Sequence, residues 1–266
     1  MRAPPSSDVG SESGDVRLVN ETGNGELILV CEHATNFVPV EYAGLGLEDL
    51  ARNSHIAWDP GAWQVAEMLS AEFDAPLIAP GVSRLVYDCN RPTQAESAVP
   101  QISETYTIPG NIGLSDAMRR ARAAQFYLPY RNTLISVIEA ALAAGRRPAI
   151  VTVHSFTPVY KEERRTLDLG VLHDDDDRLA NALLDAMSKK DDLTVRRNEP
   201  YGPEHGVTYT LAEHALPRRL LNVMIEIRND LIAEPGDQQA MAQRLADHLR
   251  AAMVNASVDH NFEVSS

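Results

Sequence analysis

The sequence predicts an α/β fold in three layers, in which helices cover both faces of a mixed, mainly parallel sheet. Short apolar runs that fit buried strands recur along the chain, at residues 26–31, 149–155 and 222–228. Between them lie longer segments with the apolar spacing of helices that bury one face. Strands that alternate with helices in this way favour parallel pairing, because each helix carries the chain back across the sheet.

The remaining elements follow from turn residues and apolar spacing. Helices are expected at residues 60–73, 115–144, 179–187 and 236–254. Further strands are expected at residues 76–79, 85–87, 166–172 and 193–196, with a long loop at residues 92–111. Pro129 is expected to kink or divide its helix. Asp59 stands before Pro60, so capping of the first helix is one explanation of this aspartate.

Length and composition fit one domain. The chain has 266 residues, of which 44% are hydrophobic and 23% are charged, as in an ordinary globular protein with a sizeable core. We expect a single domain over residues 25–256. Residues 1–24 are rich in serine, glycine, proline and acids and lack the apolar core of a signal peptide, so we expect a flexible tail there. No apolar run has the length of a membrane span.

The charge and the cysteines restrict the partners and the compartment. A formal net charge of −14 argues against a general nucleic-acid or anionic-membrane binder, since both need a basic surface. A small anionic substrate is still allowed, because a few arginines can make one pocket positive. The two cysteines, Cys31 and Cys89, make no disulfide framework and favour a reducing cytoplasm. Both fit small buried residues, and a catalytic thiol is the alternative.

Histidines stand where two of the apolar runs end. His33 follows the first run, and His154 lies at the end of the second. If the two strands are parallel neighbours, their carboxyl ends share one edge of the sheet and the two imidazoles converge. Two histidines, one carboxylate and an open position for water make a catalytic zinc site. We therefore expect one divalent metal ion, for which zinc is the best match.

Two carboxylates compete for the third ligand position. Glu32 is adjacent to His33, but neighbouring side chains in a strand point to opposite faces, so both bind one ion only if the chain turns there. Asp59 has no such restriction. We expect His33, Asp59 and His154 to be the ligands, and Glu32 to be a structural neighbour or a partner of a ligand.

Other polar groups stand where catalysis and substrate binding would need them. Glu226 interrupts an apolar run, where an unpaired charge is costly, and suits a general base that is not a ligand. An ion pair with Arg228 or another arginine is the alternative explanation. Polar residues also bracket the short apolar run at residues 85–87, like the rim of a site. Arg84 and Arg91 in that rim can hold a substrate carboxylate with paired, charge-assisted hydrogen bonds.

Five motifs in this chain resemble those of a known family. They are CEHA at residues 31–34, WDPGA at 58–62, the stretch from SR at 83–84 to DCNRP at 88–92, VHS at 153–155 and IEIRN at 225–229. In this order, over about residues 26–232, they resemble the N-formylglutamate amidohydrolase family. That family is similar in fold to the zinc carboxypeptidases and aspartoacylase, so the resemblance implies a zinc carboxypeptidase-like fold.

The resemblance also implies a role for each matching residue. In the related enzymes an Asn-Arg pair grips the substrate carboxylate, a strand-end His-Ser supplies a metal ligand, and a late-strand glutamate acts as the base. Asn90 and Arg91 would take the first role, His154 the second and Glu226 the third. His33 would take the first metal position.

The chain departs from its relatives in two places. The carboxypeptidase pattern has a glutamate three residues after the first histidine, where this chain has Asn36. The second protein ligand is therefore not carried over, and Asp59 is a prediction from the residues alone. Residues 206–210 match only loosely the Gly-Gly-Tyr stretch of the formylglutamate hydrolases of histidine breakdown.

The sequence thus predicts a cytoplasmic, metal-dependent amidohydrolase. It would cleave the amide of a small N-acyl amino acid with a free carboxylate, formylglutamate being the type substrate. The expected catalytic residues are Glu226, as the base, and Arg84, which stabilises the oxyanion. The expected substrate-binding residues are Ser83, Asn90, Arg91 and Tyr209. The alternatives are a carboxypeptidase- or aspartoacylase-like hydrolase of another substrate, and a binding protein that has lost the chemistry.

Overall fold

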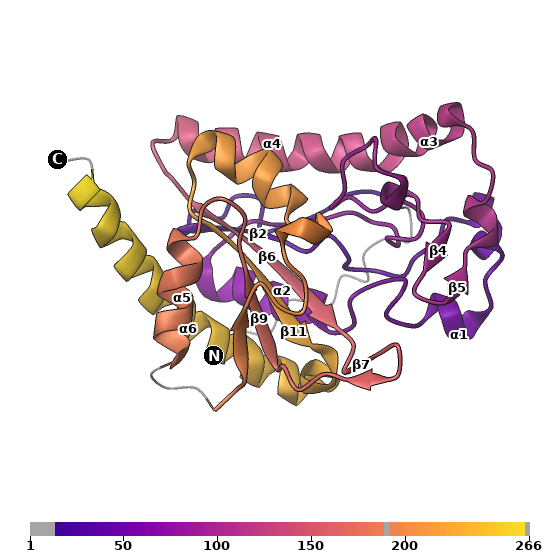
Figure 1. The fold of residues 1–266 in the computed structure, drawn as a ribbon. Coiled ribbons are helices and arrows are strands. Elements are labelled where there is room, and N and C mark those ends of the chain that lie inside the picture. Colours follow the sequence, from indigo (N-terminus) through magenta and orange to yellow (C-terminus); the bar gives the residue numbers. More distant parts are fainter. Residues whose placement is uncertain (1–13, 189–191, 264–266) are drawn as a thin grey trace, which may run out of the picture.

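A seven-stranded sheet forms the middle layer of the computed structural model, which describes residues 14–188 and 192–263 (Figure 1). In sheet order the strands are β1 (Arg17–Val19), β3 (Leu77–Ala79), β2 (Leu27–Val30), β6 (Ala149–Phe156), β11 (Asn222–Arg228), β9 (Leu169–Leu172) and β10 (Val195–Arg197). The four strands from β3 to β11 run parallel. β1 and β9 pair antiparallel to their neighbours, and β10 is parallel to β9. The mixed, mainly parallel sheet is confirmed.

The three strands predicted from the apolar runs at residues 26–31, 149–155 and 222–228 are direct neighbours in the sheet. Leu29 of β2 pairs with Val151 of β6. On the other side of β6, His154 pairs with Glu226 of β11. All three strands point the same way, so the groups at their carboxyl ends meet at one edge of the sheet.

Helices cover both faces of this sheet. Leu27 and Leu29 belong to the core on one side, and Ile28 and Val30 belong to the core on the other. The first core includes residues of α2 (Ala62–Phe73), α5 (Arg178–Ser188) and α6 (Pro235–Glu263). The second includes residues of α4 (Leu128–Ala143), which runs above the sheet in Figure 1 while α6 runs below it. Burial on both faces explains why the central strands are apolar without alternation.

The long helical segment before β6 is divided near its expected proline. α3 (Asp116–Arg122) passes through a wider helical turn, Ala123–Tyr127, into α4. Ser115 caps α3, since its side chain accepts a hydrogen bond from the backbone of Met118. Pro129 lies in the first turn of α4, where its missing N–H costs least.

Short elements surround the edge of the sheet where the central strands end. They are α1 (Asp49–Arg52), the hairpin of β4 (Ile102–Ser103) and β5 (Tyr106–Thr107), and the hairpin of β7 (Val159–Tyr160) and β8 (Glu163–Arg164). Short helical turns lie at Val40–Gly46, Glu96–Ala98, Pro109–Asn111, Pro203–His205, Leu211–Ala215, Leu216–Arg218 and Asn229–Ile232. Residues 92–111 therefore contain a hairpin within the expected long loop.

Three expected boundaries differ from the structure. The tail expected over residues 1–24 is wrong in its last part, because Leu18 of β1 pairs with Ile78 of β3; residues 1–13 lie outside the described residues. The strand expected at residues 85–87 is absent from the described structure, since Val86 donates its backbone N–H to Ser83 in a tight turn. The last helix continues to Glu263 rather than ending at 254. Within residues 14–188 and 192–263, no helix combines the length and apolarity of a membrane span.

Candidate active site

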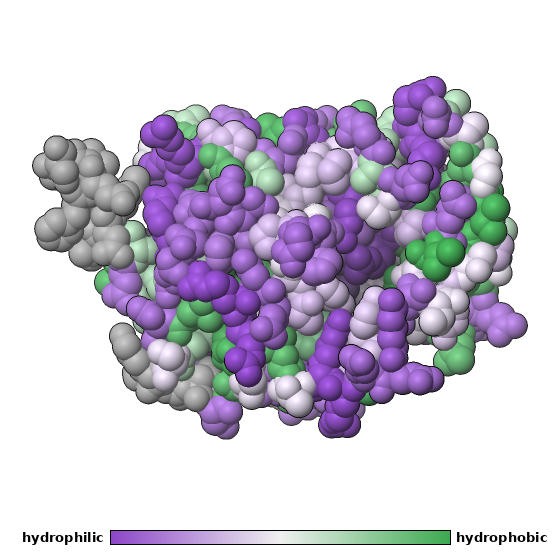
Figure 2. Space-filling view, in the orientation of Figure 1, coloured by the Kyte–Doolittle hydropathy of each residue, from purple (hydrophilic) through white to green (hydrophobic). Residues whose placement is uncertain are grey.

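A cavity of about 290 Å³ opens at the edge of the sheet where β2, β6 and β11 end. The space-filling view shows a strongly hydrophilic hollow on this side of the molecule (Figure 2). Seven of the nine predicted site residues line the cavity, namely His33, Asp59, Arg84, Asn90, Arg91, His154 and Glu226. The structure thus gathers residues from five separate sequence motifs into one place.

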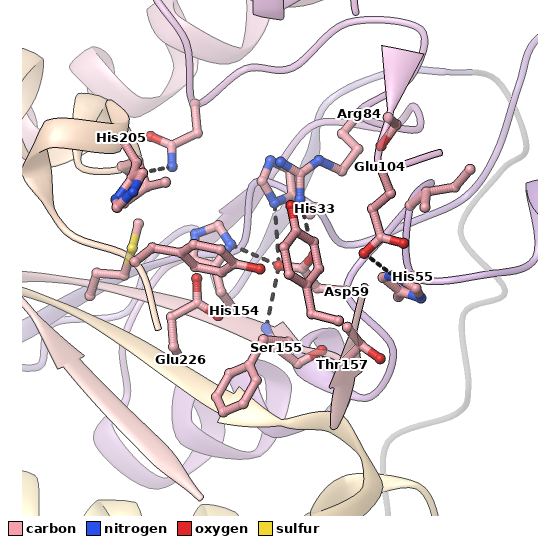
Figure 3. Close-up of a pocket in the computed structure, with 18 of the residues that line it drawn as sticks. His33, His55, Asp59, Arg84, Glu104, His154, Ser155, Thr157, His205 and Glu226 are labelled. Carbon is pink, nitrogen blue, oxygen red and sulfur yellow. Dashed lines mark hydrogen bonds and ion pairs between the residues drawn. The ribbon is translucent and has the colours of Figure 1, made fainter. Parts of the chain in front are cut away.

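The three predicted metal ligands lie in contact with one another. Oδ2 of Asp59 is 3.3 Å from Nδ1 of His33 and 2.8 Å from Nδ1 of His154. One potential ligand atom from each residue lies within 4.8 Å of the other two, and all three side chains are buried. Figure 3 shows the two rings and the carboxylate converging in the middle of the cavity wall. Two imidazole nitrogens and a carboxylate oxygen are a donor set that zinc accepts.

A second carboxylate stands behind each imidazole. Nε2 of His33 is 2.9 Å from Oδ1 of Asp88, and Nε2 of His154 is 3.0 Å from Oε2 of Glu32. Histidines that bind metals commonly donate their other ring nitrogen to a carboxylate, which fixes the orientation of the ring. In both rings Nε2 lies within 3.0 Å of such a carboxylate and Nδ1 is turned towards Asp59. The residues therefore fit a metal ion.

The number of buried carboxyl groups around the two histidines also favours a bound cation. Glu32, Asp59, Asp88 and Glu226 are at most 5% exposed. Burial raises the pKa of Asp59, but the charge of His33 and the hydrogen bond from His154 outweigh it and lower that pKa below its usual value. Burial lowers the pKa of His154, and Glu32 and Asp59 raise it well above the usual range. So many buried anions need protonated rings or a bound cation.

The backbone around Asp59 delivers its side chain to the site. The N–H of Asp59 donates to the carbonyl of His33 at 2.9 Å, which ties the start of the next helix to the end of β2. Gly61 then turns the chain with φ of +80°, and a Cβ there would lie 2.4 Å from the carbonyl oxygen of Ile232. Gly61, not Asp59, is the residue before α2, and no side chain caps that helix. Capping therefore does not explain Asp59.

Glu226 reaches the cavity from β11, next to His154. Its Oε2 is buried and has no hydrogen-bond partner among the described residues. Burial raises the pKa of Glu226 to about 7, despite the opposing charge of His154. The alternative ion pair with Arg228 is wrong, because Arg228 contacts Asp168 and Asp230 at 2.7 Å. Glu226 is thus a carboxyl group poised to exchange a proton near neutral pH.

Arg84 connects the predicted metal ligands to the opening. Its Nη1 is 3.5 Å from Oδ1 of Asp59, and its Nη2 is 3.1 Å from Oδ2 of Asp88. Burial disfavours its charge, but Asp88 and Asp59 raise the pKa of Arg84 above the usual value. Its side chain is 27% exposed, so a permanently charged guanidinium faces the cavity.

Asn90 and Arg91 hold the loop that follows residue 200. The amide of Asn90 donates to the carbonyl of Val207 at 2.5 Å and accepts from the N–H of Thr210 at 3.0 Å. Nη1 of Arg91 donates to the carbonyl of Gly206 at 2.6 Å. Both residues line the cavity, so they shape its wall whatever they bind.

Ser83 and Tyr209, two of the predicted substrate-binding residues, are not among the residues that line the cavity. Ser83 is fully buried, and its hydroxyl donates to the carbonyl of Ala57 at 2.7 Å. The hydroxyl of Tyr209 is 2.8 Å from that of Tyr127. Tyr201 from the same loop lines the cavity instead. Ser83 directly precedes the lining residue Arg84, and Tyr209 stands two positions after the lining residue Val207.

Sequence reasoning also missed an aromatic wall and a polar pair. Phe156, Tyr160 and Tyr201 line the cavity around the guanidinium of Arg165, whose Cζ is 5.4, 4.7 and 5.1 Å from the three ring centroids. His55 and Glu104 line it elsewhere and contact each other. Phe156 ends the central strand β6. The other residues come from short hairpins and loops without a motif of their own, so only the three-dimensional structure reveals them.

Known proteins resemble this chain over most of its length. The family model for N-formylglutamate amidohydrolase matches residues 25–233. The crystal structure of a gene product from Agrobacterium tumefaciens has 50% sequence identity and a TM-score of 0.90, covering 93% of this chain and 97% of its own. That of N-formylglutamate amidohydrolase from Ralstonia eutropha JMP134 has 21% identity and a TM-score of 0.57, covering 91% and 98%. The second likeness shows a shared fold. No curated protein matches the chain.

Proposed function

The chain belongs to the N-formylglutamate amidohydrolase family, and from this premise we propose that it is a metal-dependent enzyme that cleaves the amide of a small N-acyl amino acid with a free carboxylate. As a member of this family it is a hydrolase of amide C–N bonds. The observation that carries the metal-dependent part is the contact of one Asp59 oxygen with two histidine nitrogens, at 3.3 and 2.8 Å. The cytoplasmic location expected from two unpaired cysteines belongs to the same proposal.

In this proposal His33, Asp59 and His154 hold one divalent ion, with zinc as the best match. Asp88 and Glu32 keep the two rings in place. When bound, such an ion polarises the scissile carbonyl and makes a water molecule more acidic. Proton transfer and substrate binding are carried out by other side chains of this protein.

Glu226 moves the proton. Its unpartnered Oε2 takes a proton from the attacking water, whose oxygen forms the new bond to the acyl carbon. Oε2 of Glu226 then delivers that proton to the amide nitrogen as the C–N bond breaks. The products are the free acid and the amino acid. A carboxyl group with a pKa of about 7 can serve in both directions near neutral pH.

The arginines bind and orient the substrate. Arg84 offers a guanidinium beside the predicted metal ligands, where negative charge develops on the carbonyl oxygen. Asn90 and Arg91 lie at the loop after residue 200 and would take the free carboxylate of the amino acid. This local positive charge attracts an anion to an otherwise acidic protein.

A matched pair of variants tests the proposal. Glu226→Gln should keep the bound zinc, measured by elemental analysis of purified protein, and lose about 10²- to 10⁴-fold in kcat on N-formylglutamate or a related N-acyl amino acid. Glu204→Gln removes an equal charge from a side chain that is 70% exposed, and should keep the wild-type rate. Wild-type turnover by Glu226→Gln, or a wild-type protein that binds no divalent metal, would overturn the proposal.

A further inference from the structure

A second polar pair lines the cavity and takes no part in the proposed reaction. Nε2 of His55 is 2.9 Å from Oε1 of Glu104, and the two side chains are 30% and 19% exposed. His55 lies in the turn after α1, and Glu104 lies at the tip of the β4–β5 hairpin, 49 residues further along the chain. Two distant loops therefore bring an imidazole and a carboxylate together at the opening of the site.

The backbone of Glu104 is shaped to present this side chain. Glu104 has φ of +53°, in the left-handed region that favours glycine. It is the first residue of the two-residue loop between Ser103 and Tyr106, a position that glycine commonly takes in hairpins. A glutamate in that conformation is uncommon, and such residues concentrate at functional sites.

The pair lies on the acyl side of the site if the proposed function holds. In Figure 3, Glu226 and His205 lie on one side of the converging His33, Asp59 and His154, and the pair lies on the other. Arg91 belongs to the first side, because it donates to the carbonyl of Gly206, next to His205. With the amino-acid carboxylate at Arg91 and the scissile carbonyl at the centre, the acyl group extends towards His55 and Glu104.

The chemistry of the pair selects what that acyl group carries. A carboxylate only accepts hydrogen bonds, so Nε2 of His55 carries the shared hydrogen. In the neutral ring Nδ1 then offers a lone pair, and Glu104 adds a negative charge beside it. An amino group supplies both the donor hydrogens and the positive charge that such a pair attracts. A formyl group supplies neither and is too short to reach beyond the carbonyl.

Resting on the proposed function, we infer that His55 and Glu104 form a specificity pair for substrates whose acyl group bears a free amino group. The enzyme would thus favour N-aminoacyl amino acids over N-formyl and N-alkanoyl ones. His55 and Glu104 touch the far end of the acyl group and not the reacting atoms, so they control selection rather than the chemical step.

Two isosteric substrates test the inference. Glycylglutamate and N-propionylglutamate differ only in an amino group in place of a methyl group. The wild-type protein should favour the glycyl compound by about 10- to 100-fold in kcat/KM, the range expected for a hydrogen bond to a charged group. Glu104→Gln keeps the shape and removes the charge, so it should bring the ratio close to one by lowering kcat/KM on glycylglutamate. Glu96→Gln, an exposed carboxylate outside the cavity, should keep the wild-type ratio.

The outcomes separate this inference from the proposed function. Turnover of both compounds without preference, or a preference that survives in both Glu104→Gln and His55→Gln, would overturn the inference alone. If neither compound is hydrolysed, the proposed reaction fails for them, and the ratio of their dissociation constants from titration calorimetry tests the pair directly. Equal dissociation constants, or binding of neither, would then overturn the inference as well.

Discussion

Oε2 of Glu32 lies 3.0 Å from Nε2 of His154, although Glu32 stands next to His33 in the chain. The register of the sheet explains this pairing. Val30 of β2 pairs with Thr152 of β6, so Glu32, two residues further on, comes level with His154. Asp88 takes the corresponding place behind His33. Each histidine is thus oriented by a carboxylate from a different segment, and the ring geometry depends on the fold as a whole.

This relationship predicts that Glu32 controls metal affinity without being a ligand. Glu32→Gln should weaken zinc binding by about 10- to 100-fold, as loss of a carboxylate behind a histidine ligand commonly does. Competition with a chromophoric chelator measures the change directly. Glu26→Gln removes an exposed carboxylate at the start of the same segment and serves as the control. Equal zinc affinity in the two variants would show that Glu32 does not support the site.

The sequence was most informative where burial and strand direction determine position. The apolar runs around His33, His154 and Glu226 indicate strands, and parallel pairing brings strand ends to one edge of a sheet. Asp59 is predicted as the third ligand because Glu32 is adjacent to His33, and neighbouring side chains in a strand point to opposite faces. These four residues therefore gather as expected. The resemblance added Asn90 as a partner of Arg91, and both residues line the cavity.

The sequence was least informative where position depends on contacts between loops. β1 has only three residues and belongs to the sheet because β3 offers a free edge. Residues 85–87 are apolar like a strand, but a backbone turn at Ser83 buries them in a loop. His55 and Glu104 meet across 49 residues without any periodic signal. Such pairings depend on how hairpins fold over the sheet, which local patterns do not encode.

The aromatic wall predicts a positioning role for Arg165. Its guanidinium packs on Phe156, Tyr160 and Tyr201 and donates to the Tyr201 hydroxyl at 3.1 Å. Each such contact contributes about 0.5–1 kcal/mol. Arg165→Ala should therefore loosen the wall and raise KM by about 5- to 30-fold, with little change in kcat, because Arg165 does not touch the reacting atoms.

Steady-state kinetics checks this split between KM and kcat. Arg164→Ala removes an exposed arginine from the same hairpin and should behave as wild type. Arg165→Lys keeps a cation but loses the planar stacking, so its KM should lie between that of the wild type and that of Arg165→Ala. A fall in kcat with unchanged KM in Arg165→Ala would contradict the positioning role.

The cysteines are predicted to be inert. Cys31 and Cys89 are at most 1% exposed, and burial raises the pKa of both thiols well above the usual value. A buried thiol with a raised pKa is a poor nucleophile. Neither should react with an aromatic disulfide reagent in the folded protein, and both should react in denaturant. Cys89→Ala should keep the wild-type kcat. Rapid labelling in the folded protein, or loss of turnover in that variant, would support the alternative that a cysteine is catalytic.

The burial of His214 predicts that the free energy of unfolding decreases in acid. Burial lowers its pKa to about 4, and its Nδ1 is buried without a partner among the described residues. In the unfolded chain a histidine has a pKa of about 6.5. Between these values the unfolded state binds a proton that the folded state does not. The free energy of unfolding contributed here is therefore complete above pH 6.5 and falls as the pH drops towards 4, by at most about 3 kcal/mol.

Comparison of wild type with His214→Leu isolates this contribution, because the buried carboxylates that also titrate in acid are common to both. Urea unfolding at pH 7 and at pH 4.5 gives the loss of stability for each protein. The wild type should lose about 2 kcal/mol more than the variant over this interval, since most of the difference in proton binding falls within it. Parallel losses in the two proteins would mean that His214 takes up its proton equally in the folded and unfolded states, and that the burial of its ring does not limit stability in acid.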